Sequence, residues 1–122
     1  IDHSMAHTLS AHYDTPHGVA CAMLLPVAME FNKPVCAERL VDVARAMGVD
    51  VAGMSTEEAA GAAIAAVRQL SADVEIPHIC NGLVAEDLEQ LATDAMADAC
   101  FPGNPREADH AQVVDLFRKV MA

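Results

Sequence analysis

The sequence predicts an all-α protein, a helical bundle of about six helices, and three observations lead to this fold class. Hydrophobic residues make up 53% of the 122 residues and aromatic residues only 3%. Alanine supplies much of the apolar content, and it has the highest helix propensity of the amino acids. β-Branched runs that alternate with polar residues, the pattern of half-buried strands, are absent. A chain of this length is expected to form one domain, residues 1–122, around one core.

The first two helices are predicted from apolar residues at helical spacing. Residues 1–12 form the first helix, and the Asp-Thr-Pro run at residues 14–16 breaks it. Either of the first two residues of that run is expected to cap the next helix, residues 18–31. This second helix is so apolar that it should be buried on most sides and kinked at Pro26, which has no backbone donor. Pro34 is expected to begin a short loop.

The remaining helices are marked by apolar stripes and by start and stop signals. Ser55 with Glu58, and Asp109 with Gln112, have the spacing of a capping box. Gly48 is a typical C-terminal stop. The apolar stripes that mark three of these helices lie at residues 40–47, 88–95 and 113–120, and the helix that follows Ser55 is expected at residues 56–70.

Charge and cysteine content exclude several classes of function. The formal net charge of −11 argues against nucleic acid or an anionic membrane as a partner, and the scattered acidic residues indicate solvated helix faces. The four cysteines show no C-x-x-C spacing, so neither a zinc ribbon nor a disulfide framework is expected. Free thiols fit a reducing, cytoplasmic setting. No signal peptide is visible, and the longest apolar run, residues 19–28, is too short to span a bilayer.

Three histidines crowd the amino-terminal end of the chain. His3 and His7 are four residues apart, so they project from one face of a helix. His17 stands between Pro16 and Gly18, where the chain can turn back towards the first helix. Two imidazoles brought together in this way suit zinc, iron, copper or nickel. From spacing alone, a structural role is the more frequent one for such histidines.

Several motifs carry a resemblance to a known family. They are His-x-Met-Ala-His-x-Leu at residues 3–9, Pro-His-Gly-Val-Ala at 16–20, Leu-Leu-Pro at 24–26, Phe-Asn at 31–32 and Asn-Pro-Arg at 104–106. In this order and spacing, they resemble the iron-containing (group III) alcohol dehydrogenases, with most likeness to the lactaldehyde reductase and propanediol dehydrogenase group. Ser10, where the family usually has Gly, and Val27, where it often has His or Tyr, depart from the pattern.

The resemblance implies a fold, a site and a chemistry. The fold is the helical carboxy-terminal domain of the dehydroquinate synthase-like arrangement. His3 and His17 are then metal ligands for Fe²⁺, with zinc as an alternative, and an upstream Asp and His complete the set. His7 lies in the catalytic cleft. Cys100 lies near the substrate pocket, although a small apolar residue at a helix end explains it equally well. An upstream domain binds NAD or NADP, and a small alcohol or aldehyde exchanges a hydride with the nicotinamide.

The upstream partners of that site are not present in these residues. The chain begins at Ile1 and contains neither the Asp-x-x-x-His pattern nor a Gly-rich nucleotide-binding segment. We therefore expect a fragment that is inactive alone and that self-associates through apolar surface, giving a homo-oligomer. Two alternatives remain open: a stand-alone, non-catalytic helical domain that acts by self-association, and a metal-independent reductase relative. His12 is expected to be a surface residue, and Asn104 and Arg106 to organise the last loop.

Overall fold

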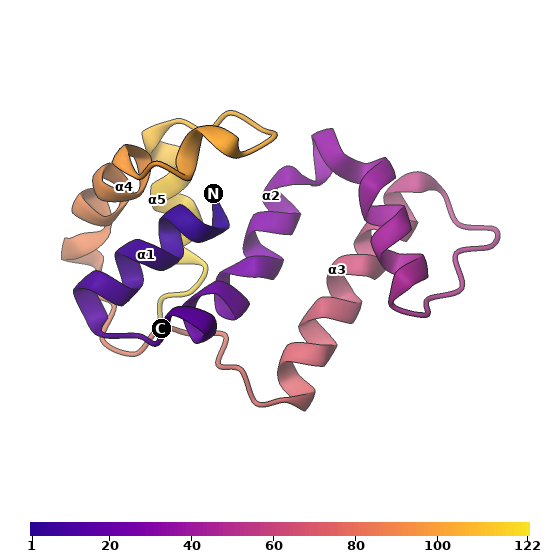
Figure 1. Cartoon of the computed structure of the whole chain (residues 1–122), viewed down its shortest axis with the longest axis horizontal. Coiled ribbons are helices and arrows are strands. Elements are labelled where there is room, and N and C mark those ends of the chain that lie inside the picture. The colour runs from indigo at the N-terminus through magenta and orange to yellow at the C-terminus, as the bar shows by residue number, and fades with distance from the viewer.

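The computed structural model describes all 122 residues and contains helices and loops but no strand, so the predicted all-α class is confirmed. The structure has five α-helices connected by loops, and Figure 1 shows how they are arranged. Two short 3-10 turns, η1 and η2, flank the fourth helix in sequence. The elements are α1 (Asp2–Tyr13), α2 (His17–Ala46), α3 (Thr56–Asp73), η1 (Ala85–Asp87), α4 (Leu88–Ala97), η2 (Phe101–Gly103) and α5 (His110–Arg118).

The predicted loop at Pro34 is wrong. The segments expected as separate helices, residues 18–31 and 40–47, are one continuous helix of 30 residues with Pro26 and Pro34 inside it. This is why five α-helices are found where about six were expected. The second half of α2 turns away from the first half in Figure 1, and a proline inside a helix is the usual cause of such a bend. As expected, the first half of α2 is buried on most sides. Its buried residues are these: Ala20, Met23, Leu24, Pro26, Val27, Ala28 and Phe31.

The helix ends confirm most of the predicted signals. Ser55 Oγ accepts a hydrogen bond from the backbone N–H of Glu58 at 3.1 Å. The capping box of Asp109 and Gln112 is present in both directions. Gly48 follows the end of α2 with a φ of +82°, which favours glycine. The predicted cap of α2 is wrong, because α2 starts after Pro16 with no side-chain cap.

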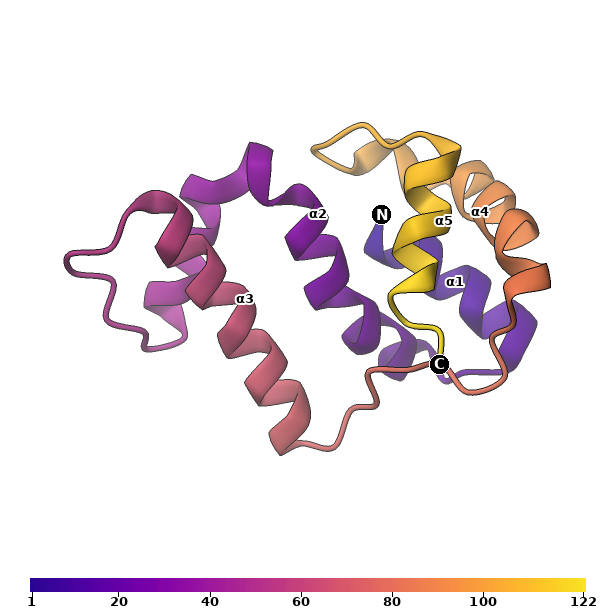
Figure 2. The ribbon, with the colours of Figure 1, turned by 180° about the vertical axis from the view of Figure 1, so that it is seen from behind.

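Two hydrophobic cores share helix α2. The main core contains 21 buried residues, which come from α1, the first half of α2, α4, α5 and the loops beside them. The small core contains five, from the second half of α2 and from α3: Leu40, Ala44, Ala60, Ala63 and Ile64. In the half of the molecule that holds the main core, α1 lies in front in Figure 1 and α5 lies in front in Figure 2. Helix α2 therefore crosses from one core to the other.

Helix α2 is also long and apolar enough to meet a length-and-composition test for a membrane span, with a mean hydropathy of 1.3 over 18 residues. Of that window, 44% is buried inside the fold. The buried face of α2 packs against α1 and α3, and the core helix of a folded domain can have the same composition.

Candidate metal centre

Three imidazole rings meet where α1 and α2 lie together. His3 and His7 project from α1, and His17 is the first residue of α2. The ring centroids of His3 and His17 are 5.6 Å apart, and those of His7 and His17 are 5.3 Å apart. All three side chains are exposed. The Pro16 break thus brings the second helix back against the first, as the sequence predicted.

Two of these histidines form a group with the geometry of a metal site. Ligand atoms of His3, His17 and Cys21 all lie within 4.8 Å of one another. Imidazole nitrogens and a sulfur are donors that divalent transition metals accept. The donor set therefore fits a divalent transition metal, the kind of ion that the resemblance implied for His3 and His17. Cys21 was not predicted as a member, although its position four residues after His17 on one helix was a readable signal.

His7 belongs to a different group. Its Nδ1 lies 2.8 Å from Oδ2 of Asp98, the residue that ends α4. Cys100 completes this group, with all three ligand atoms within 4.8 Å of one another. The backbone N–H of Cys100, and then His7, hydrogen-bond the Asp98 carboxylate and lower its pKa. Asp98 was interpreted as part of a solvated helix face, and no sequence signal relates it to a histidine 91 residues away.

Two further contacts join α1 to the segment that contains α4. Nε2 of His12 lies 2.9 Å from Oδ2 of Asp94 and lowers the pKa of that carboxyl group. The Tyr13 hydroxyl donates to Asp87, and burial together with this bond raises the pKa of Tyr13 to about 12. His12 lies at the surface as expected, but it is paired. Three residues of α1 are thus held by three carboxylates, and this fixes how α1 sits beside α4 (Figure 1).

The carboxyl group of Asp2 lies beside the histidines. Burial raises its pKa, and the neighbouring charges that lower it include His3 and His17. Its Oδ1 is buried and has no hydrogen-bond partner. Burial, followed by the charge of Asp2, also raises the pKa of the Cys21 thiol.

The Asn-Pro-Arg segment has the structural role that the sequence predicted, but its side chains bond to α2, where the expectation was the last helix and its loop. Asn104 and Asn32 exchange two side-chain hydrogen bonds, at 2.8 and 2.9 Å. Arg106 donates to the backbone carbonyl of Phe31 at 2.6 Å, and its guanidinium lies 4.1 Å from the centre of the Phe31 ring. Because Phe31 precedes Pro34 by one turn, these contacts stabilise α2 close to the proline that interrupts its hydrogen bonding.

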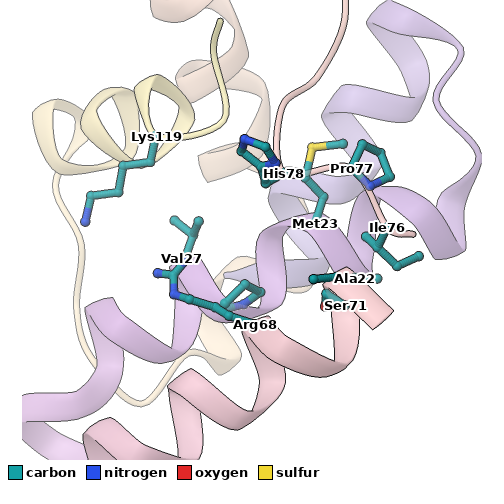
Figure 3. Close-up of a pocket in the computed structure, with 11 residues that line it drawn as sticks. Ala22, Met23, Val27, Arg68, Ser71, Ile76, Pro77, His78 and Lys119 are labelled. Carbon is teal, nitrogen blue, oxygen red and sulfur yellow. The ribbon is translucent and has the colours of Figure 1, made fainter. Parts of the chain in front are cut away.

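A pocket of about 380 Å³ lies on another part of the surface. Figure 3 shows that Met23 and Val27 of α2, Arg68 of α3, His78 and Lys119 border it. None of the residues predicted for the site, His3, His7, His17 and Cys100, lines this pocket. This pocket and the histidine cluster are separate features.

Comparison with known proteins decides the family. Residues 1–121 match the family model described as "Fe-containing alcohol dehydrogenase family, C-terminal". The chain belongs to the iron-containing alcohol dehydrogenase family. It is 50% identical over 117 residues to a lactaldehyde reductase of Escherichia coli, and 40% identical over 119 residues to a 1,3-propanediol dehydrogenase of Klebsiella pneumoniae. These matches cover 94% and 96% of the chain.

Solved structures of the iron-containing alcohol dehydrogenase family share the fold. A crystal structure of 1,3-propanediol oxidoreductase superposes with a TM-score of 0.96 at 38% identity, covering 98% of this chain. An alcohol dehydrogenase from Oenococcus oeni gives a TM-score of 0.93 at 42% identity, again over 98% of the chain. The chain spans 31% of the length of the two curated relatives and 32% of each of these solved chains. It corresponds to the carboxy-terminal domain of the family.

Proposed function

We propose that this chain forms the metal-binding carboxy-terminal part of an iron-dependent, NAD(P)-linked alcohol dehydrogenase. The intact enzyme interconverts a small aldehyde and a primary alcohol, a substrate class supported by the names of the relatives. The observation that carries the proposal is the meeting of His3 and His17 from two helices, with His7 beside them. A cytoplasmic location is part of the same proposal.

The residues of this chain divide the work between binding and proton transfer. His3 and His17 hold the metal through their imidazole nitrogens. When bound, the metal supplies Lewis-acid chemistry that polarises the substrate oxygen. The Asp98 carboxylate accepts a hydrogen bond from Nδ1–H of His7 and so leaves Nε2 free to hold or move a proton in the cleft. Asp98 is thus a positioning residue for His7, and Cys100 lines the substrate pocket.

Metal titration tests the part of this proposal that lies within the chain. Two imidazoles leave most of a coordination sphere to water, so a ferrous or zinc ion should bind weakly if these are its ligands. Both His3→Ala and His17→Ala should reduce the affinity, because each removes one imidazole ligand. His12→Ala is the matched control on α1. Equal affinity in all four proteins would remove His3 and His17 from the site.

An activity assay tests the role of the nucleotide-binding part. We expect the 122-residue chain alone not to reduce aldehydes with NADH or NADPH, because hydride transfer needs a bound nicotinamide. Metal-dependent turnover that exceeds that of a His7→Ala control would contradict this expectation.

The second candidate is a non-catalytic domain that acts by self-association. The observation that favours it is the set of large apolar side chains on the surface, of which Val74, Val35 and Leu70 are 60%, 57% and 53% exposed. Sedimentation of the purified chain separates the two: a stable oligomer without metal binding favours association, whereas metal binding that needs His3 and His17 favours the enzyme.

A further inference from the structure

We infer that Cys21 is a third ligand from this chain to the metal ion held by His3 and His17, so that the chain's own donor set is two imidazoles and a thiolate that prefers zinc to ferrous iron. This inference rests on the proposed function, because it takes His3 and His17 as ligands. It goes further by adding a sulfur donor and a metal preference.

The distances support a shared ion. Cys21 Sγ lies 3.6 Å from Nε2 and 3.9 Å from Nδ1 of His17, and the three ligand atoms of the group lie within 4.8 Å of one another. Bond lengths to zinc place the ligand atoms of a tetrahedral site roughly 3.3–3.6 Å apart. The sulfur faces both ring nitrogens, so the ring of His17 must turn before one nitrogen points at the ion. His17 is exposed, and this terminal torsion is soft in histidine.

The ring nitrogens of His3 and His17 are also available to bind a metal ion. His7, His12 and His110 each lie within ion-pair distance of a carboxylate. His3 and His17 form no ion pair, although the Asp2 carboxyl group lies near both, and the only hydrogen-bonding neighbour of either is Cys21. The Cys21 thiol is free and half-buried. The helix fixes its spacing from His17, because residues four apart share one face.

The donor type sets the metal preference. Thiolate ligands favour zinc, whereas a set of imidazole and carboxylate ligands discriminates less against iron. Binding requires the thiol to lose its proton: the sulfur–metal bond forms as the proton passes to solvent. Metal uptake should therefore release a proton that a Cys21→Ser variant does not release.

Cobalt(II), a spectroscopic substitute for zinc, tests the sulfur directly. The 122-residue chain saturated with cobalt(II) should show the intense near-ultraviolet charge-transfer band of a sulfur–cobalt bond. Cys21→Ser should lose the band and bind cobalt(II) and zinc about tenfold or more weaker, since even outer-shell losses cost about 10- to 100-fold. In the wild type, zinc should displace bound cobalt(II) at a lower concentration than ferrous iron needs. Cys21→Ser should reduce this difference between the two competing ions.

Two cysteine variants serve as matched controls. Cys36→Ser, on the same helix outside the group, and Cys100→Ser, in the group of His7, should both keep the band. A wild-type protein without the band at saturating cobalt(II), or a band lost only in Cys100→Ser, would overturn the inference. A wild-type spectrum without the band overturns the inference even if a variant fails to fold.

The same titrations separate this inference from the proposed function. If His3→Ala and His17→Ala abolish binding while Cys21→Ser binds as the wild type does and the band is absent, only the role of Cys21 fails. If none of the three variants changes the affinity, the proposed metal site fails with it.

Discussion

The main core and the small core are built on the same helix, yet only one of them positions chemistry. The main core buries 21 residues and includes the large side chains of Phe117, Met5 and Leu91. Three of the five residues in the small core are alanines, and the elements around it carry exposed apolar residues such as Leu70 and Val74. The candidate metal centre lies entirely against the main core. The comparison indicates that the main core stabilises the site and that the second half of α2, with α3, forms a weaker appendage.

Matched leucine-to-alanine substitutions on α2 should show the largest difference in stability between the two cores. Leu24 is 0% exposed in the main core and Leu40 is 8% exposed in the small core. We expect Leu24→Ala to cost near the top, and Leu40→Ala near the bottom, of the range of about 2–5 kcal/mol for such cavities. Urea unfolding of the two variants measures the difference. Equal losses would show that the two cores contribute alike.

The next effect concerns the bend between the cores. Arg106→Lys keeps the charge but loses the guanidinium contacts with the carbonyl and the ring of Phe31. We expect the free energy of unfolding to fall by about 1–3 kcal/mol. Arg118→Lys is the control, because its exposed ion pair with Asp115 should contribute less than about 1 kcal/mol. If both variants unfold alike, the bend does not depend on Arg106.

Helix caps should distinguish the two regions by a smaller amount. Asp109 caps the nine-residue α5 of the main core with a reciprocal pair of hydrogen bonds to Gln112. Ser55 caps the 18-residue α3 with one side-chain hydrogen bond. Replacing a cap by alanine costs about 0.5–2 kcal/mol. We expect Asp109→Ala to lie above Ser55→Ala within that range in thermal or urea unfolding. The reverse order would mean that helix length outweighs cap geometry.

The smallest effect is a dependence on acid. Folding lowers the pKa of Asp94 and of Asp98, through His12 for the first and through Cys100 and His7 for the second. Their ionised forms therefore stabilise the fold above the unfolded pKa of about 3.9, and this contribution is lost as the pH falls through the lower folded values. The double variant Asp94→Asn, Asp98→Asn should flatten the acid side of a plot of Tm against pH. Asp73→Asn on α3 should leave that slope unchanged; a changed slope there would contradict the assignment.

The sequence predicted what depends on local pattern. The helix starts at Ser55 and Asp109 follow from capping chemistry, and the approach of His17 to α1 follows from the Pro16 break. The continuation of α2 through Pro34 was not predictable, because the contact between Arg106 and Phe31 joins residues 75 apart. The pairing of His7 with Asp98 was not predictable either, since it joins residues 91 apart. Local signals place a side chain on a helix face, but only tertiary packing chooses its partner.

The long sequence separation of these contacts has a consequence for biosynthesis. The segment that includes Asp98, Asn104 and Arg106 closes onto α1 and α2 from 72 to 91 residues away. During translation, the histidine-bearing helices leave the ribosome well before this segment does. Closing so long a loop is slow compared with forming the helices themselves. The histidines are therefore synthesised before the segment that holds their helices in place.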